Sequence, residues 1–201
     1  QLQRDGQTDA ARKLLEQALE GDPQSVQAHN ELVRLYHQSG DFDRARQHYE
    51  AAVALYPGDI LAGLEYGNSL AERGQFDKAA TVFARVVEYH PAHADAHALL
   101  GQTYEELGQQ DKASKHYQAA LASDPTNRHA NFLQGRHLLN SGQADEARVY
   151  LDRSVANPDR QTAMYLYQAA LACQDANERE LALTYLQRAR TEAADGGQRQ
   201  L

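Results

Sequence analysis

The prolines of this 201-residue chain recur at one interval. Pro23, Pro57, Pro91 and Pro125 are spaced by 34 residues, and Pro158 follows after 33. Glycine and alanine form two further rows with the same period: Gly6, Gly40, Gly74, Gly108 and Gly142, and Ala11, Ala45, Ala79, Ala113 and Ala147. Three rows that share one period identify an internal repeat, and such a repeat predicts stacked supersecondary units.

Each repeat predicts two amphipathic helices joined by a tight turn. In residues 26–57 an apolar stripe predicts the first helix over 26–38: Ala28, Leu32, Leu35 and Tyr36. Gly40 follows as the residue best able to adopt a left-handed conformation after a helix. Asp41 can then cap a second helix over 42–55. The chain is therefore expected to be all-α.

Small residues recur on both helices of the repeat, so the two helix axes can approach closely. The first helices carry Ala28, Ala62, Ala96, Ala130 and Ala163, with Gly67, Gly101 and Gly135 beside them. Large residues fill the seam between the helices: Tyr36, Leu70, Tyr104 and Leu138, opposite Tyr49, Phe83, Tyr117 and Leu151. One pair cannot bury its apolar face alone, so neighbouring pairs are expected to stack.

These rows resemble the tetratricopeptide repeat. The pattern is clearest in residues 94–127, with Ala96, Leu100, Gly101, Tyr104, Gly108, Ala113, Tyr117, Ala120 and Pro125. The family's tryptophan is absent, and its row holds His29, Gly63, His97, Asn131 and Met164. The resemblance implies a right-handed α-solenoid of antiparallel helix pairs, a superhelix. Four complete units are expected, at residues 26–59, 60–93, 94–127 and 128–160.

The two ends depart from the repeat. Residues 1–25 match only a second helix, which indicates a fragment cut from a longer array or a lost upstream stretch, or alternatively a lone capping helix. Residues 161–194 predict a divergent last unit, with Ala163, Tyr167 and Leu171 on its first stripe and Ala182, Leu186 and Ala189 on its second. Two inserted residues are expected at 175–179. Arg190 replaces the apolar row of Val155 and suits a water-facing end, and 195–201 are expected to be a disordered tail or linker.

Composition excludes several function classes. A net charge of −8 argues against nucleic acid or an anionic membrane surface as partner. No apolar run approaches the ~18 residues that a membrane span needs, and the compartment, cytoplasmic or periplasmic, stays open. The sequence contains no phosphate-binding loop, dinucleotide fingerprint or nucleophile elbow, so no catalytic residue and no cofactor is predicted.

The single cysteine and the histidines are the remaining candidates for chemistry. Cys173 is interpreted as a small packed residue. His93 and His97 have the four-residue spacing of paired metal ligands, with His90 nearby, but no Cys or carboxylate motif completes a set. No metal site is predicted.

The resemblance implies that the first helices line a groove for a partner peptide or protein segment. The candidate groove residues are Asn30, Arg34, Glu65, Asn68, Glu72, Asp95, Gln102, Glu105, Glu106, Phe132, Arg136 and Tyr165. The middle of this set is acidic, so a partner with basic and apolar residues is expected. Phe132 and Tyr165 are either an apolar anchor site or packing residues between adjacent first helices. A subset of the family grips chaperone C-termini with a carboxylate clamp, whose lysines are absent here.

The predicted function is a protein–protein interaction scaffold. Family habits suggest a bacterial assembly such as a secretion, pilus or polysaccharide-export apparatus. The alternative is a regulatory or substrate-presenting region of a larger enzyme such as a transferase, and a third reading is a peptide-binding chaperone. Self-association through the incomplete N-terminal repeat is a further expectation.

Overall fold

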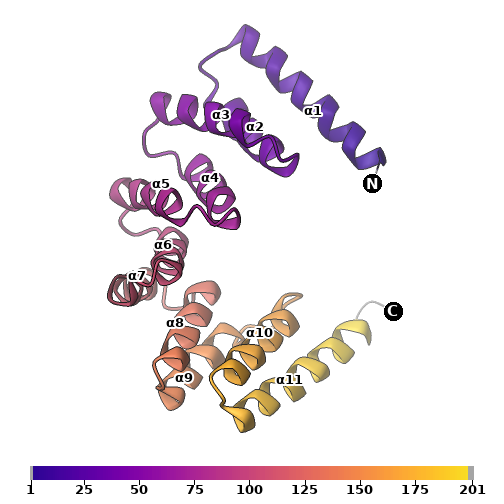
Figure 1. Ribbon diagram of the computed structural model, residues 1–201. Coiled ribbons are helices and arrows are strands. Elements are labelled where there is room, and N and C mark those ends of the chain that lie inside the picture. The colour runs from indigo at the N-terminus through magenta and orange to yellow at the C-terminus, as the bar shows by residue number, and fades with distance from the viewer. Residues whose placement is uncertain (1, 199–201) are drawn as a thin grey trace. The chain divides into compact units, whose positions relative to one another are not determined.

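A computed structural model describes the backbone of residues 2–198 and the side chains of residues 8–194. The chain divides into two compact units, residues 1–109 and 110–201, and each unit is described by itself. Within residues 2–198, every regular element is an α-helix (Figure 1). The predicted all-α class is therefore confirmed.

Unit 1 contains six helices within its described residues. They are α1 (Leu2–Gly21), α2 (Val26–Gln38), α3 (Phe42–Leu55), α4 (Ile60–Glu72), α5 (Phe76–Tyr89) and α6 (Ala94–Glu106). The first helices of the repeat are α2, α4 and α6, and the second helices are α1, α3 and α5. The bounds of α2 and α3 coincide with those predicted from the stripe, the glycine and the cap.

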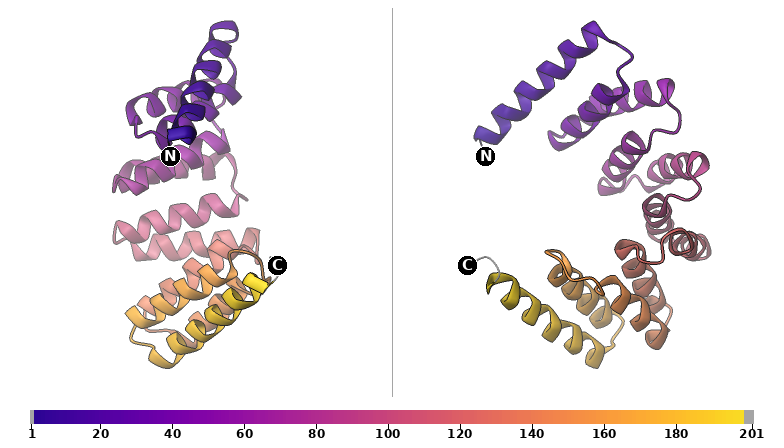
Figure 2. Two further views of the ribbon diagram at one scale, coloured as in Figure 1. Left: turned by 90° about the vertical axis from the view of Figure 1, so that its right-hand side faces the viewer. Right: turned by 180° about the vertical axis from the view of Figure 1, so that it is seen from behind.

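Unit 2 contains five helices within its described residues. They are α7 (Gln110–Ser123), α8 (Arg128–Asn140), α9 (Ala144–Ser154), α10 (Thr162–Asp175) and α11 (Arg179–Gln198). The first helices are α8 and α10, and the second helices are α7, α9 and α11. The pairs α8/α9 and α10/α11 pack closely, and α11 runs beside α10 in both views of Figure 2.

The turn inside each pair depends on one residue in the left-handed region. Gly142, with φ of 74°, follows α8. Its N–H donates to the Leu139 carbonyl oxygen at 2.9 Å, and the N–H of Gln143 donates to the Leu138 carbonyl oxygen at 2.9 Å. These bonds satisfy carbonyls that the end of a helix leaves unpaired. Gly40, Gly74 and Gly108 adopt the same conformation, which explains the glycine row apart from Gly6, which lies within α1.

Helix pairs in unit 1 approach closely because of their small residues. A Cβ at Gly67 would overlap the ring of Phe83, and a Cβ at Gly63 would overlap the side chain of Val86. The neighbouring pairs meet through Tyr49 and Tyr66, whose rings stack with centroids 4.4 Å apart. The rows of small and large residues therefore form one core that extends from Val33 to Leu100, and Leu32, Tyr36 and Ala45 form a second cluster.

The N-terminal helix α1 packs on α2 as a second helix would pack on the next unit. Leu15 and Leu19 lie against buried Leu32 and Tyr36. The Tyr36 hydroxyl donates to the Glu16 carboxylate, which ties the two helices together across the contact. The opposite side of α1 remains exposed.

The predicted alignment of α10 with the first helices of the earlier repeats was wrong. Asn177, with φ of 63°, replaces the glycine of the turn, and the N–H of Glu178 donates to the Cys173 carbonyl oxygen at 2.8 Å. These bonds match those of Gly142 and Gln143, so α10 follows α8 by 35 residues. The extra residue therefore lies in the loop before α10, and the insertion predicted at 175–179 was wrong.

The corrected register changes the buried stripe of α10 and leaves that of α11, where Ala182 and Ala189 are buried as predicted. The buried side of α10 carries Leu166, Ala169, Ala170 and Cys173, whereas Tyr167 and Leu171 are exposed. On α11, Leu186 is exposed and Tyr185 is buried, with its hydroxyl 3.3 Å from Asp152 of α9. Helix α11 also continues through Gln198, so the disordered tail predicted from residue 195 was wrong up to that point. Glu192, Ala193 and Ala194 favour helix and carry it into the two glycines. Residues 199–201 lie outside the described part of the chain.

Candidate functional site

The first helices of unit 1 form a strongly acidic surface. Within their sequences α2, α4 and α6 contain Arg34 as their one arginine and no lysine. Their acids are Glu31, Glu65, Glu72, Asp95, Glu105 and Glu106. All six side chains are exposed or half-buried. We call this surface the acidic face.

Several polar residues of the acidic face are held by neighbours. The Asn30 side-chain amide donates to the Asp59 carboxylate at 3.0 Å, and Asp59 in turn caps α4. The Arg34 guanidinium lies 2.6 Å from the Glu31 carboxylate, three residues earlier on the same helix. These contacts give Asn30 and Arg34, both predicted groove residues, a structural role as well.

Charges on α4 and α6 extend the same surface. Nε2 of His37 lies 3.1 Å from the Glu72 carboxylate, and this contact becomes an ion pair only when the imidazole is protonated. Glu65, Asn68 and Gln102 are half-buried, and Glu106 is exposed. A surface with this excess of carboxylates attracts cationic groups over about one Debye length, ~10 Å at 0.1 M salt.

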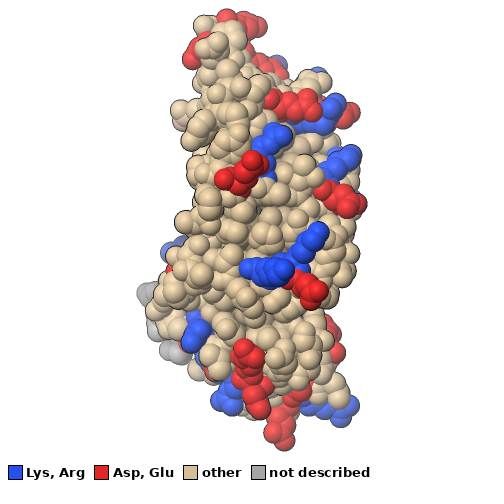
Figure 3. Space-filling view, turned by 90° about the vertical axis from the view of Figure 1, so that its left-hand side faces the viewer, with Lys and Arg blue, Asp and Glu red and all other residues tan. Residues whose placement is uncertain are grey.

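The second helices α3 and α5 of unit 1 carry balanced charge. Their acids are Asp43, Glu50, Asp77 and Glu88, and their bases are Arg44, Arg46, Lys78 and Arg85. Figure 3 views the side on which α3 and α5 lie and shows Lys and Arg beside Asp and Glu there. The charge asymmetry therefore distinguishes the acidic face from the opposite side of the same unit.

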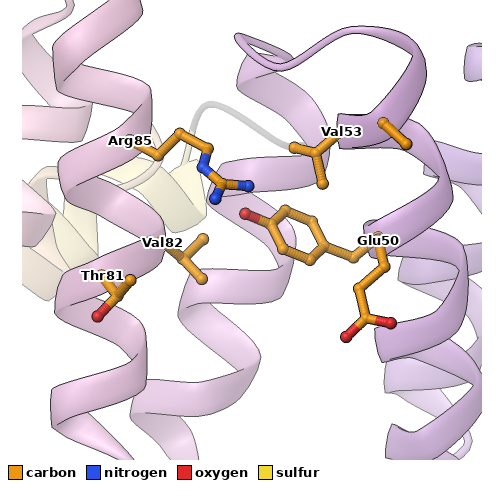
Figure 4. Close-up of a pocket in the computed structure, with 7 residues that line it drawn as sticks. Glu50, Val53, Thr81, Val82 and Arg85 are labelled. Atoms are coloured by element: carbon orange, nitrogen blue, oxygen red, sulfur yellow. The ribbon is translucent and has the colours of Figure 1, made fainter.

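A shallow hollow of about 400 Å³ lies between α3 and α5. Figure 4 shows Thr81, Val82 and Arg85 along one helix of the hollow and Glu50 and Val53 on the other. The Arg85 guanidinium hydrogen-bonds to the Tyr49 hydroxyl, and burial raises the pKa of that phenol above its usual value. The hollow is shallow and carries charges of both signs, from Glu50 and Arg85, so it makes a weaker candidate than the acidic face.

The predicted aromatic anchor of unit 2 is a packing contact. Phe132 and Tyr165 are both buried, and their rings meet edge to face with centroids 5.7 Å apart. The Arg128 guanidinium lies over the Tyr165 ring at 5.4 Å. The contact joins α8 to α10, as the packing interpretation predicted, so neither ring is available to a partner. Arg136, the third residue of this part of the predicted groove, is half-buried on the same helix as Phe132.

Apolar residues of unit 2 other than Phe132 and Tyr165 are exposed. Met164, Tyr167 and Leu171 lie on one side of α10 at helical spacing, and all three are exposed. Sequence reasoning missed them because it aligned Ala163 with Ala130, 33 residues earlier, and placed two inserted residues in the turn after α10. The signal that could have found them was Asn177, since asparagine is the residue after glycine that best tolerates a left-handed turn.

The histidines around Pro91 have structural partners. Nδ1 of His93 accepts from the N–H of Ala96 and so caps α6. Nε2 of His97 lies 3.0 Å from the Pro91 carbonyl oxygen, and Nε2 of His90 lies 2.6 Å from that of Gly58. Within the residues that the structure describes, no group of three or more His, Cys, Asp or Glu is placed to hold a metal ion.

The lone cysteine is packed inside unit 2, as predicted. Cys173 is fully buried on α10, and burial raises the pKa of its thiol to about 11. The reactive thiolate is therefore scarce at neutral pH.

Comparison with known families identifies the repeat. The model of the tetratricopeptide repeat matches residues 2–60, 64–128 and 106–163. The chain belongs to the tetratricopeptide repeat family. No curated protein matches it in sequence. In the described part of this tetratricopeptide protein, every helix is too short or too polar to cross a bilayer.

Three solved tetratricopeptide structures illustrate the shared fold. PilF of Pseudomonas aeruginosa has a TM-score of 0.73 at 23% identity, covering 94% of this chain and 86% of PilF. YrrB, described as having an unusual peptide-binding site, has a TM-score of 0.62 at 23% identity, covering 90% and 93%. MamA of Desulfovibrio magneticus has a TM-score of 0.64 at 22% identity, covering 76% and 86%. At these identities the likeness shows the fold alone.

Proposed function

We propose that this tetratricopeptide protein is an interaction scaffold whose acidic face holds a partner segment rich in lysine or arginine. The observation that carries the proposal is the charge asymmetry of unit 1, because α2, α4 and α6 carry six acids and one arginine, whereas α3 and α5 are balanced. Stability alone does not require such an asymmetry, since like charges on one surface repel. The peptide-binding site attributed to YrrB supports a peptide as the class of ligand.

Apolar residues within the acidic face define the partner further. Leu61 is exposed and Leu64 half-buried on α4, on the same helix as Glu65 and Glu72. A segment that alternates basic and apolar residues would neutralise the carboxylates and cover the leucines. Electrostatic attraction would raise the association rate, and the apolar contacts would slow dissociation.

Charge neutralisation on matched faces tests the proposal. The variant Glu65→Gln/Glu72→Gln/Glu106→Gln removes three charges from the acidic face, and Asp43→Asn/Asp77→Asn/Glu88→Gln removes three from the second helices. The probe is a fluorescein-labelled peptide of alternating lysine and leucine, measured by anisotropy at several salt concentrations. We expect the acidic-face variant alone to raise the Kd about tenfold and to flatten its salt dependence. Equal effects of the two variants would refute the proposal.

Self-association through α1 is a second candidate, favoured by the exposure of Leu14. Leu14 is two-thirds exposed, whereas Val82, 68 residues later in the same row of the repeat, is buried. A second chain could cover this side of α1. Sedimentation velocity over a range of concentrations tests the idea: Leu14→Glu should lower the sedimentation coefficient at high concentration if α1 mediates pairing.

A further inference from the structure

The end of unit 2 exposes a surface that the preceding helix pair keeps buried. With the 35-residue register of α10 and α11, Tyr167, Leu186 and Arg190 correspond to Phe132, Leu151 and Val155. The earlier three are 8%, 0% and 4% exposed, whereas Tyr167 is 52% and Leu186 39% exposed. Leu171 extends the apolar surface along α10. We call Tyr167, Leu171, Leu186 and Arg190 the end face.

In the preceding pair, a helix covers the equivalent surface. Helix α10 packs on α8, where the ring of Tyr165 meets that of Phe132 edge to face. Tyr167 is therefore the α10 counterpart of Phe132, the α8 residue against which the ring of Tyr165 packs. An uncovered surface of the same pattern fits a helix seated in the same way.

The described chain leads away from the end face instead of returning over it. In the preceding pair, α9 ends at Ser154 and α10 begins at Thr162. Ala189 of α11 corresponds to Ser154, but α11 continues without a break to Gln198. The turn that brings a covering helix back in the preceding pair is absent at this point of α11. Within the described residues, no helix of this chain covers the end face.

Arg190 defines the charge of that helix. Val155 is an apolar residue at the corresponding position of the preceding pair, and Arg190 is an exposed cation. Covering a guanidinium with an apolar helix would leave a buried charge unpaired, which strongly opposes binding. A carboxylate on the incoming helix would pair with it, and the planar guanidinium suits two-pronged bonding to a carboxylate.

We propose that the end face of unit 2 is a docking surface for an amphipathic helix of a partner protein. The helix places apolar or aromatic residues on Tyr167, Leu171 and Leu186, as α10 does on Phe132, and an Asp or Glu opposite Arg190. This surface is distinct from the acidic face, lies in the other unit and selects the opposite charge. One scaffold would thus hold two partners of different chemistry.

Two peptides test the proposal on the full chain. The first has the sequence of residues 158–175 with Cys173→Ala, because α10 is the helix that packs on the equivalent surface. The second carries Gln161→Glu, Gln168→Glu and Gln174→Glu in addition. Both carry fluorescein, and binding is measured by anisotropy. We expect the acidic peptide to bind about tenfold more tightly than the first peptide.

Variants of the end face separate its apolar and charged contributions. Tyr167→Ser/Leu186→Ser should weaken both peptides about tenfold or more, whereas the control Leu55→Ser/Val149→Ser, which changes two exposed apolar residues elsewhere, should weaken neither. Arg190→Val should abolish the preference for the acidic peptide. Circular dichroism verifies that each variant folds.

Several outcomes would overturn the proposal. One is that neither peptide binds at concentrations up to about 1 mM. Another is that the end-face and control variants lose peptide affinity equally. A third is that Arg190→Val still binds the acidic peptide more tightly than the first peptide. Sedimentation that shows self-association abolished by Tyr167→Ser/Leu186→Ser would assign the face to a second copy instead. The neutralised acidic face of unit 1 should leave both peptides unaffected, so the two proposals fail independently.

Discussion

Nδ1 of His29 lies 3.0 Å from Nδ1 of His48, so one ring donates and the other accepts. Nε2 of His29 lies 3.2 Å from the Pro23 carbonyl oxygen, which can only accept. His29 therefore carries its proton on Nε2 and accepts at Nδ1, and His48 is the donor.

This pair predicts that acid weakens the fold of unit 1. Burial, and then the neighbouring His29, lower the pKa of His48 below its usual value near 6.5. Below about pH 6.5 the unfolded chain takes up a proton that folded His48 refuses, so stability falls with pH until the folded pKa is reached. Urea unfolding should show a lower midpoint at pH 5.5 than at about pH 7.5. His48→Gln should reduce this difference, and His93→Asn, which preserves a helix cap, should leave it unchanged.

Removing the Tyr36 hydroxyl should loosen α1. In Tyr36→Phe the Glu16 carboxylate loses its donor and Arg44 loses its acceptor, and the net effect of one such hydrogen bond is about 1 kcal/mol. Hydrogen exchange read by mass spectrometry should become faster in α1 than in α4. Tyr66→Phe is the control, because its ring packs on Tyr49 within the same unit. Equal exchange in the two variants would contradict a tethering role for Tyr36.

Gly67→Ala should destabilise unit 1 by about 1–3 kcal/mol. The added methyl would overlap the ring of Phe83, which is fully buried and cannot move aside without disturbing its neighbours. Gly21→Ala is the matched control, because a Cβ there meets nothing within 4 Å. Chemical denaturation should therefore show a loss for the first variant and none for the second.

The turn before α11 offers a test of backbone strain. Asn177 adopts φ of 63°, a conformation that costs most side chains about 1–2 kcal/mol. Asn177→Ala should lower the free energy of unfolding by about 1 kcal/mol, and Asn177→Gly should be close to neutral. If both variants behave alike in thermal unfolding, the left-handed turn is not what limits this position.

The sequence predicted the fold in detail wherever the repeat was regular. The rows of Pro, Gly and Ala determined the helix class, and a stripe, a glycine and a cap located α2 and α3 to the residue. The acidic face also followed from sequence, because charge on the first helices does not depend on fine packing. Whether it binds a basic partner stays a prediction.

The last helix pair could not be read in the same way. A loop before α10 that is one residue longer looks, in sequence, like a loop one residue shorter followed by a turn two residues longer, since both place Asn177 35 residues after Gly142. Two residues of error turned the helix by about 200° and placed buried Tyr165 in the groove and exposed Tyr167 in the core. Only the hydrogen bonds around Asn177 decide between the two alignments. Likewise, the partnership of Asn30 with Asp59 depends on the packing of α2 on α4, which no local pattern reveals.

The extra residue before α10 determines where segments of this array can be exchanged with those of another repeat protein. Chimeric repeat proteins are assembled by exchanging segments of constant length, and a cassette cut every 34 residues from Ala130 would begin α10 one residue early. Its first helix would then enter the host rotated by about 100°, with Tyr167 at the buried position of Leu133. Boundaries chosen 35 residues apart, from the Gly142 turn to the Asn177 turn, would transplant the pair in phase.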